Sequence, residues 1–377
     1  MIEYLEIRDK STRQMIGVID TASSIIWETE YYGAGSFEVF VKLDENTRQL
    51  LQIGNYITRQ DERNAAIIES LEYTDSVENG VMIIARGRML KSILDRRLAF
   101  YLNGHTLKPV RMSGNLANAI FGVIKSQAGV NAQTARKMGV VTGSKGGITK
   151  IIRSAQGESS SRQSSYKNLL TFTDGVLEEF ECGALMRIDR ETLEMTYDLF
   201  EGVDRSISNT GGNDPVIFSQ DFDNLLSVDY STDTTYFKNW ALIGGEGEGL
   251  NRFYSTYSPS TPTGLDRREV FVDAWSYPKK YEEDGEEHEY TDEVYDEMIV
   301  GQAQTDMKEY VTTEVFVGEI NLTESPYQYN VDFGLGDIVT VQDNMLGLVK
   351  DVRILRATEV QDENGYVINF EYGTGGN

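Results

Sequence analysis

The sequence predicts a mainly β fold with α+β insertions, built from two pseudo-equivalent antiparallel β-barrels and peripheral α+β domains. Three observations lead to this prediction. The 377 residues include 21 Tyr and 35 Gly but only 6 Pro, a composition that favours strands and tight turns. Apolar residues alternate along several short segments, which is the period of a strand. Finally, a stretch near the start of the chain is repeated near its end, so one small barrel is expected to occur twice.

Residues 1–97 are predicted to form the first barrel as a meander of antiparallel strands. Every second residue from Phe37 to Leu43 is apolar, so these side chains fall on one face of a strand. A largely aliphatic run lies between Gly80 and Gly87. The pair Asn79-Gly80 precedes it and is typical of tight hairpin turns, because both central positions of such a turn favour positive φ.

Residues 98–203 show a different pattern and are predicted to form a small α+β domain. Ser113 can cap a helix whose apolar stripe runs from Leu116 to Ile124 and which ends near Gly129. A loop rich in Gly, Ser and basic residues is expected over 129–164. The segments expected after it are a helix over roughly 165–180 and two strands over 184–190 and 194–200.

Strand patterns return after a linker at 211–215. They are expected over 225–230, over 239–245, and from Val311 almost to the end of the sequence. Between the last two, residues 246–310 contain Gly-, Pro- and Ser-rich turns and a strongly acidic segment, 281–297, in which ten of 17 residues are Asp or Glu. A helix is expected to begin near Thr291 and to run toward Tyr310.

The internal repeat is the most informative feature of the sequence. Residues 54–61 and 336–343 share Gly, Thr, Gln and Asp at the same offsets. Further along, a Glu-Asn-Gly turn, an apolar run and a glycine recur in both halves, with Gly80 and Gly87 corresponding to Gly365 and Gly373. The alternative is a chance agreement of two ordinary hairpins. A true duplication would let three chains build a ring of six near-equivalent barrels.

Charge is distributed unevenly along the chain. The net charge of −25 argues against general affinity for nucleic acid, because phosphate would be repelled. Residues 86–167, however, contain 15 Lys or Arg and two acids, so this stretch carries +13 and the remainder −38. We expect the basic stretch to dock an acidic neighbour, although a basic, solvated face of one domain is the alternative. The interface candidates are Arg96, Arg97, Arg136, Lys137, Lys145 and Lys150.

No residue of the chain is nominated for catalysis, cofactor binding or metal binding. Cys182 is the only cysteine, which excludes intrachain disulfides and a multi-thiolate zinc site. The two histidines are His105, in an expected turn, and His288, in an acidic loop. Neither has the apolar, constrained setting that a general base requires. The acidic segment lacks the alternating spacing of a calcium loop, which favours a solvated or interface-facing charge cluster.

The glycine-rich segment 244–249 could be mistaken for a phosphate-binding loop. It lacks the Lys-Ser/Thr pair of such loops, and Glu246 and Glu248 would repel a phosphate. We therefore expect its glycines to let the backbone pack closely against another strand or subunit. These further interface candidates are Gly244, Gly245, Gly247 and Gly249.

The sequence predicts a protein made in the cytosol, without membrane insertion by this chain. Its first residues show no basic region, apolar core and cleavage site of a secretory signal. No apolar run approaches the roughly 18 residues that a spanning helix needs.

Several segments resemble one known family. They are Lys238–Gly249 followed by Arg252 and Gly264–Asp273, the C-terminal Phe333–Asp337 and Glu371–Gly373, and the N-terminal Gly35–Val39 followed by Leu51 and Gly54. Together they are similar to siphophage tail proteins of the baseplate-hub or tail-tip class. The likeness runs from end to end, is strongest over 238–273 and is weakest over 129–164. Arg267 and Arg268 in the strongest stretch join the interface candidates.

The resemblance implies a homotrimeric hub with two barrels, the second of them discontinuous. The domains implied are a first hub barrel over 1–97, an α+β domain with the basic loop over 98–203, a second hub barrel from 204–245 and 311–374, and an inserted acidic domain over 246–310. The hub would close the tail tube, connect it to distal tail proteins and leave a channel for DNA. We expect part of the acidic surplus to line that channel, because an acidic wall would not retain phosphate.

The function implied is therefore that of a structural virion component, assembled in the host cytoplasm, that is not an enzyme and uses no cofactor. Its implied partners are tail tube proteins, a tape-measure protein, and tail fibre or receptor-binding proteins, without specific nucleic-acid binding. One alternative is a tail-associated cell-wall-degrading enzyme, a peptidase or glycosidase. The end of the sequence soon after its last expected strand puts a lytic extension in doubt. The other alternative is a host-surface carbohydrate-binding module, suggested by Tyr230, Tyr236, Trp240 and Trp275.

Overall fold

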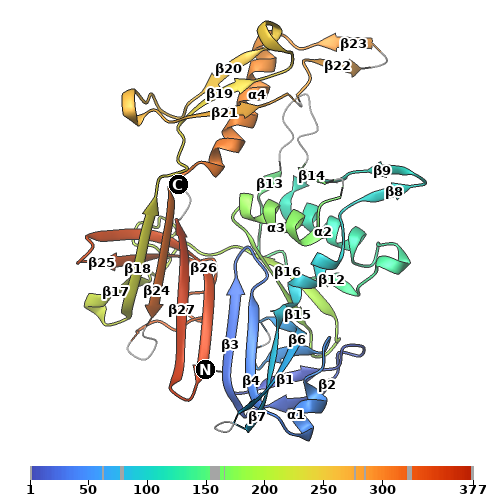
Figure 1. Ribbon diagram of the computed structural model, residues 1–377, viewed down its shortest axis with the longest axis vertical. Helices are drawn as coiled ribbons and strands as arrows, with labels where there is room; N and C mark the ends of the chain where they lie inside the picture. Colours follow the sequence, from blue (N-terminus) through green and yellow to red (C-terminus); the bar gives the residue numbers. More distant parts are fainter. Residues whose placement is uncertain are drawn as a thin grey trace. The chain divides into compact units, whose positions relative to one another are not determined.

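A computed structural model describes residues 2–61, 63–76, 80–152, 162–164, 166–275, 277–283, 286–320 and 325–374 (Figure 1). The chain divides into two compact units. Unit 1 comprises Met1–Asp229 and Phe316–Asn377, and unit 2 comprises Tyr230–Val315. The fold is mainly β, as predicted, and antiparallel pairing dominates its largest sheet. No helix in the described ranges is long and apolar enough to cross a membrane.

The first hundred residues supply one half of a large sheet in unit 1. Its elements are β1 (Leu5–Arg8), β2 (Met15–Ile19), β3 (Ala22–Glu30), β4 (Ser36–Lys42), α1 (Glu45–Leu50), β5 (Tyr56–Arg59), β6 (Ala65–Ser76) and β7 (Gly80–Met89). The alternation expected from Phe37 to Leu43 is present on β4, where Phe37, Val39 and Val41 are buried. Helix α1 begins at a capping box in which the Asp44 side chain accepts from the Thr47 amide.

The second half of the sheet comes from the later part of the chain. Its elements are β17 (Ile217–Ser219), the 3₁₀ helix η3 (Gln220–Phe222), β18 (Leu225–Asp233), β24 (Thr313–Ile320), β25 (Ile338–Asp343), β26 (Leu348–Asp362) and β27 (Gly365–Thr374). Both halves form a single 13-stranded sheet with the order β18-β24-β27-β26-β3-β4-β7-β6-β5-β1-β2, and β25 pairs with β26 and β17 beside this path. In the described residues the path is open at β18 and β2, so the prediction of two closed barrels is not confirmed.

The strand order nevertheless repeats. In the first half the neighbours are β3-β4-β7-β6-β5, and in the second they are β18-β24-β27-β26-β25, with the strands used in the same chain order. The hairpins β6–β7 and β26–β27 occupy equivalent places in this order, and both have a register shift at the same point. The shift lies between Ile68 and Ser70 in the first hairpin and between Ile354 and Arg356 in the second. The repeat seen in the sequence is therefore a repeat of topology.

One correspondence expected from the sequence is displaced by a residue. Gly87 pairs with Ile68 immediately before the first bulge, and Tyr372 pairs with Ile354 immediately before the second. The residue equivalent to Gly87 is thus Tyr372 and not Gly373. Gly80 and Gly365 each begin the second strand of their hairpin, and the position seven residues further on is Gly87 in the first hairpin and Tyr372 in the second. Residues 77–79 of the first turn, with Asn79, lie outside the described residues.

Residues 90–200 form the α+β part of unit 1. Its elements are η1 (Leu90–Arg96), β8 (Tyr101–Asn103), β9 (Thr106–Lys108), β10 (Val110–Met112), β11 (Gly114–Asn115), α2 (Leu116–Gln127), η2 (Thr134–Arg136), β12 (Val140–Thr142), β13 (Ile151–Ile152), β14 (Arg162–Ser164), α3 (Leu169–Glu179), β15 (Gly183–Ile188) and β16 (Met195–Phe200). The apolar stripe expected on the first helix is buried from Leu116 to Ile124. Short strands occupy much of the loop expected over 129–164, of which 153–161 lie outside the described residues.

The cap expected at Ser113 is wrong. Asn115 caps α2 instead, and its side chain accepts a hydrogen bond from the Asn118 amide at 3.0 Å. Gly114 has φ +78°, and both Gly114 and Asn115 pair with β13, which keeps this part of the chain extended up to the cap.

Unit 2 is a small α+β unit of its own. Its elements are β19 (Trp240–Gly244), η4 (Gly249–Asn251), β20 (Tyr254–Tyr257), η5 (Gly264–Asp266), β21 (Glu269–Asp273), β22 (Lys280–Glu283), β23 (Glu286–Glu289), α4 (Asp292–Asp306) and η6 (Met307–Glu309). Tyr295, Ile299 and Ala303 of α4 pack against a sheet with the order β20-β19-β21. The segment 239–245, expected among the strands of the second barrel, lies in this sheet. The division of the chain into four domains otherwise stays a prediction.

Candidate assembly interfaces

The two halves of the large sheet meet at one antiparallel seam. Along it, β26 pairs with β3 from Arg356 opposite Glu30 to Gln361 opposite Ile25. The N-terminal part of β26 pairs on the same side with β25, so β26 is covered along its length by two strands in succession. The chain therefore joins its two repeats by continuous β-pairing.

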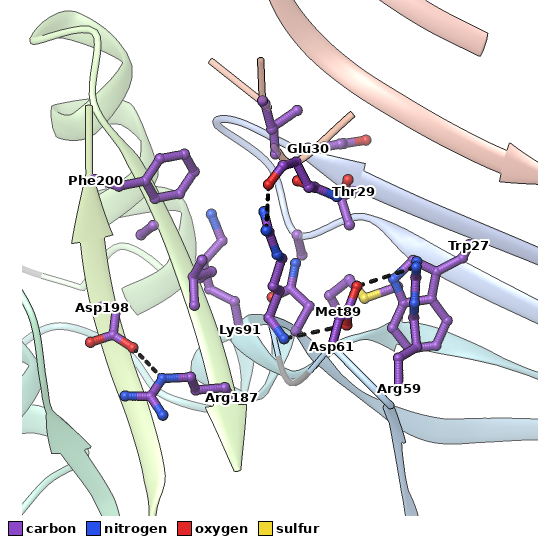
Figure 2. A pocket seen from close by; sticks show the side chains of 18 of the residues that line it. Trp27, Thr29, Glu30, Arg59, Asp61, Met89, Lys91, Arg187, Asp198 and Phe200 are labelled. Carbon is purple, nitrogen blue, oxygen red and sulfur yellow. Dashed lines mark hydrogen bonds and ion pairs between the residues drawn. The ribbon is translucent and has the colours of Figure 1, made fainter. Parts of the chain in front are cut away.

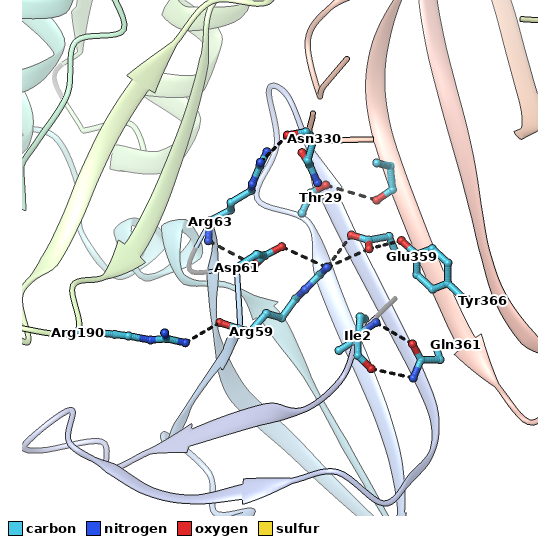
Figure 3. Close-up of polar contacts among 11 residues, drawn as sticks. Ile2, Thr29, Arg59, Asp61, Arg63, Arg190, Asn330, Glu359, Gln361 and Tyr366 are labelled. Carbon is cyan, nitrogen blue, oxygen red and sulfur yellow. Dashed lines mark hydrogen bonds and ion pairs between the residues drawn. The ribbon is translucent and has the colours of Figure 1, made fainter. Parts of the chain in front are cut away.

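A cluster of buried polar side chains connects the two halves of the sheet at this seam (Figure 3). The guanidinium of Arg59, from β5, donates two hydrogen bonds to the carboxylate of Glu359, on β26, at 2.6 and 3.1 Å. The Tyr366 hydroxyl also donates to Glu359, and the Arg59 guanidinium lies 5.6 Å from the ring centre of Trp27. Burial lowers the pKa of Arg59, but the adjacent Glu359 carboxylate outweighs it, so the net direction is upward.

A second clamp ties the start of the chain to the same seam. The Ile2 amide donates to the side-chain oxygen of Gln361 at 2.8 Å, and the Gln361 amide donates back to the Ile2 carbonyl at 2.9 Å (Figure 3). Both ends of the sequence thus contribute to the junction between the repeats.

One face of the sheet is polar and carries a lattice of ion pairs. The opposite face is apolar, because residues such as Ile25 and Trp27 on β3 alternate with Glu28 and Glu30. The ion pairs join Arg86 to Glu38 and Glu72, Arg88 to Glu69 and Asp95, and Arg356 to Glu28, Glu30 and Glu371. Seven carboxylates thus surround three guanidinium groups, which leaves this face with an acidic excess.

Besides the outer edge of β2, two stretches of backbone in the same sheet have no strand beside them in the described residues. The first is the C-terminal half of β6, since β5 pairs with β6 only from Ala65 to Ile67. The second is the outer edge of β18, which ends the strand path. Side chains on both are exposed, including Tyr73 at 52% and Leu226 at 54%.

A cavity of about 610 Å³ lies in unit 1 beside the seam (Figure 2). Several charged groups in its wall are paired within the chain: Arg187 with Asp198 at 2.9 Å, and Lys91 with Asp174 at 3.1 Å. Burial raises the pKa of Asp174 to about 6, although Lys91 opposes the shift. Because these two pairs satisfy each other, neither presents a free charge to the cavity, and the Arg63 guanidinium in the same wall donates to the Asn330 carbonyl.

The basic interface candidates lie in the α+β part of unit 1. They differ in whether their charged groups already have partners within the chain. Arg97 donates to the Arg136 carbonyl at 3.0 Å, and Arg136 itself packs 4.5 Å over the Phe100 ring and donates to the Leu98 and Phe100 carbonyls. Lys150 pairs with Glu201 at 2.9 Å, Lys145 donates to Asn118, and Arg96 lies 3.9 Å from Glu69. Lys137 is exposed and has no ion pair in the described residues. The six therefore differ in how available their charges are to a partner.

A small hairpin, β8–β9, adds an exposed surface that the sequence analysis did not single out. Its strand residues are all exposed, and Leu102 and Leu107, paired across the hairpin, are 52% and 44% exposed. Lys108 lies on it and Arg111 just beyond it, both exposed. No Asp or Glu occurs between Asp95 and Glu158, whereas ten Lys or Arg do. The signal that could have found this surface is the expected hairpin turn at Asn103-Gly104.

The glycine candidates have partners within unit 2. A side chain at Gly244 would meet the Arg252 guanidinium, and one at Gly245 would meet the Tyr295 ring. Arg252 donates to the carbonyls of both glycines at 2.9 Å. Gly247 and Gly249 have positive φ values of 106° and 55°. Close packing within the unit accounts for Gly244, Gly245 and Gly247, and the positive φ accounts for Gly249.

The remaining interface candidates have partners within unit 2, and the single cysteine is buried. Arg267 stacks 3.8 Å over Trp240, and Arg268 donates to the Thr234 carbonyl, both within unit 2. Burial raises the pKa of Cys182 to about 11, which keeps the thiol protonated. The described residues contain no group of three His, Cys, Asp or Glu side chains placed to hold a metal ion.

Comparison with known proteins shows a consistent relationship. The model of one family, described as Siphovirus ReqiPepy6 Gp37-like protein, matches residues 4–374. No curated protein matches the chain. Among solved structures, a tail protein from Neisseria meningitidis MC58 is 13% identical with a TM-score of 0.58, and the match covers 99% of this chain and 97% of that one.

Two prophage proteins give similar matches. The 43 kDa tail protein of prophage MuSo2 from Shewanella oneidensis is 12% identical, with a TM-score of 0.57 and coverage of 99% of this chain and 98% of that one. The prophage tail protein gp18 from Listeria monocytogenes EGD-e is 12% identical, with a TM-score of 0.50 and coverage of 98% and 94%. At these identities the likeness shows a shared fold.

Proposed function

The chain belongs to the siphovirus ReqiPepy6 Gp37-like family of phage tail proteins, and from this premise we propose that it is the homotrimeric hub of a tail tip or baseplate. In this role it closes the tail tube, connects the tube to distal tail proteins and leaves a central channel for DNA. Its role is structural and not enzymatic. Its further partners are tail tube proteins, a tape-measure protein, and fibre or receptor-binding proteins, and it assembles in the host cytoplasm.

The observation that carries the proposal is the duplicated strand order joined by the β3–β26 seam. One chain already contains two copies of the same arrangement, paired edge to edge. Three such chains present six near-equivalent units around one axis, so a threefold ring can match a sixfold tube. The hub barrels are then completed in the assembly and not within a single chain.

The polar face of the sheet is the surface best suited to the channel wall. Its seven carboxylates exceed its three guanidinium groups, and the arginines are held within ion pairs. An acidic wall whose arginines are held in ion pairs repels phosphate and does not retain passing DNA. The apolar face is occupied by the core of unit 1.

The copy number in assembled tails tests the hub role directly. Purified phage particles would be digested with isotope-labelled reference peptides from this chain, and the number of copies per tail would be counted by mass spectrometry. We expect three copies per tail. One, two or six copies would contradict a homotrimeric hub. The count does not depend on whether the trimer also forms off the tail.

We further propose that the basic surface of the α+β part docks an acidic neighbour in the tail. The exposed cations best suited to the test are Lys108, Arg111 and Lys137, because Arg136 and Lys150 hold the fold together. Reversing all three to Glu is expected to reduce incorporation into tails on the order of tenfold, since each reversal turns attraction into repulsion. The loss should be greatest at low salt.

A matched control has the same change in charge elsewhere. The triple variant Lys238→Glu, Lys280→Glu, Lys308→Glu alters cations of unit 2 and should incorporate nearly as well as the wild-type chain. Incorporation would be measured by complementing a phage that lacks the gene and counting infectious particles. Equal incorporation of both triple variants and the wild type would refute the docking role.

A further inference from the structure

We propose that the open face of the small sheet in unit 2 binds a neutral polysaccharide of the host cell surface. Its sugar rings stack on aromatic side chains that this face exposes. We call this surface the aromatic face, and it consists of Leu242, Arg252, Tyr254, Phe271, Asp273 and Trp275. The choice of the host surface follows from the proposed place of the chain at the tail tip, whereas the binding itself does not depend on that role.

The aromatic face is the side of the sheet that α4 leaves uncovered. Side chains alternate between the two faces of the strands, and Ile243 and Val272 point toward the core that α4 completes. Tyr254 and Phe271 point to the other side, where they are 51% and 49% exposed. The two rings lie on the strands either side of β19, roughly 10 Å apart. This spacing leaves room for consecutive sugar rings.

Arg252 holds these two rings in place. Gly244 has no side chain, and the Arg252 guanidinium occupies the space above it, where it donates to the Gly244 carbonyl at 2.9 Å. The guanidinium lies 5.4 Å from the centre of the Phe271 ring and 6.0 Å from that of Tyr254. A cation fixed between two rings orders both in advance, so little side-chain entropy is lost when a ligand binds.

Asp273 connects Trp275 to the same network. One carboxylate oxygen of Asp273 accepts from the Trp275 amide at 3.1 Å and from the Arg252 guanidinium. The side chain of Asp273 is 60% exposed, and Trp275 is 65% exposed. In the sequence Asp273 lies between Phe271 and Trp275, so its carboxylate can accept hydroxyl groups from a sugar stacked on either ring.

The mixture of rings and charged groups selects the class of ligand. A sugar ring has apolar C–H faces and a rim of hydroxyl groups, so it needs an aromatic surface with hydrogen-bonding groups beside it. The core of a protein–protein interface is instead depleted of charged residues. Because Arg252 and Asp273 lie among its rings, the aromatic face suits a sugar better than the apolar core of a partner protein.

The charge of unit 2 disfavours an anionic polymer. The unit contains 7 Lys or Arg and 19 Asp or Glu, a net charge of −12. On the aromatic face Arg252 is paired with Asp273, and Arg267 is paired with Glu269 at 2.6 Å. Nucleic acid or an acidic polysaccharide would be repelled by the unit, and both of these guanidinium groups are already paired. The ligand that fits is therefore uncharged.

Affinity electrophoresis of the full-length chain tests the proposal. The chain would migrate through native gels that each contain one neutral polysaccharide: a mannan, a β-glucan, a galactan, an arabinan or a rhamnan. At least one of them should retard it. Phe271→Ala combined with Trp275→Ala is expected to raise the dissociation constant on the order of tenfold, since two stacking surfaces are lost. Trp275→Phe keeps a ring and should stay within about twofold of the wild type.

A matched control is Tyr101→Ala combined with Tyr166→Ala. It removes two exposed aromatic side chains of unit 1 and should leave the affinity unchanged. If the double variant at the aromatic face does not fold, the wild-type chain still provides an answer, because a bound polysaccharide should protect the exposed Trp275 from quenching by acrylamide.

Retardation by none of the five polysaccharides would overturn the proposal, as would equal retardation of the wild type and the folded double variant. If no polysaccharide is bound and the double variant is absent from tails, the aromatic face docks another tail protein instead. The copy count tests the hub independently, so failure of the binding and failure of the hub are distinguishable.

Discussion

Replacing Arg59 by Leu is expected to lower the free energy of unfolding of unit 1 by about 3–5 kcal/mol. The side chains of Arg59 and Glu359 are 8% and 4% exposed. The substitution leaves the Glu359 carboxylate buried between the repeats with only the Tyr366 hydroxyl as a described partner. An uncompensated buried charge is among the largest destabilising changes that one substitution can produce.

The double variant Arg59→Leu, Glu359→Leu is the informative control. It removes both charges and fills the site with apolar groups, so its stability should return to within about 1–2 kcal/mol of the wild type. A second control, Arg96→Leu, breaks an exposed pair with Glu69 in unit 1 and should cost less than about 1 kcal/mol. If the single and double variants at the seam were equally unstable, the ion pair would not be the cause.

Tryptophan fluorescence can isolate the relevant unfolding transition. The chain has three tryptophans, and Trp240 and Trp275 both lie in unit 2. In a Trp240→Phe, Trp275→Phe background, the remaining Trp27 is 1% exposed and lies at the seam itself. Its emission during urea denaturation then reports the stability of unit 1 alone.

Replacing Gly87 by Ala is expected to destabilise unit 1 by about 2–3 kcal/mol. The added methyl would lie 1.9 Å from the Ile67 carbonyl oxygen, which is backbone and cannot move independently of the sheet. The close approach occurs because β6 bulges immediately after Ile68, the residue that pairs with Gly87. The same denaturation measurement applies.

Gly373→Ala is the matched control for Gly87→Ala. The added methyl would meet only the side chain of Leu355, at 2.5 Å, and that side chain can rotate away. Its cost should stay below about 1 kcal/mol. Equal costs for the two variants would indicate that the two glycines are equivalent, as the sequence comparison suggests, and would contradict the register described here.

The sequence predicted correctly those features that are set by residues only a few positions apart along the chain. The alternation on β4 and the stripe on α2 are both buried as predicted, because a face of one strand or helix is set by residues a few positions apart. The repeat was also visible, since its turn and glycine residues constrain the backbone directly. Its register was missed by one residue at Gly373, because two glycines near the ends of similar strands were matched by residue type, and residue type alone does not fix which residues pair.

Contacts between distant segments were not predictable in the same way. Nothing in the local pattern places Arg59 against Glu359, 300 residues away. The basic stretch shows the same limit. Arg86 and Lys91 count toward its charge of +13, yet they pair with Glu38 and Asp174, so the folded surface is less basic than the sequence. The β8–β9 hairpin was missed because its strands are only three residues long.

The two repeats differ most at the connection between their first two strands. In the first repeat, residues 31–35 join β3 to β4, whereas in the second the chain leaves β18 and returns at β24 only after an entire folded unit. A compact insert whose own ends lie on neighbouring strands imposes little entropic cost on its host. This connection is consequently a natural attachment point, where evolution or an engineer could exchange one accessory module for another and leave the large sheet unaltered.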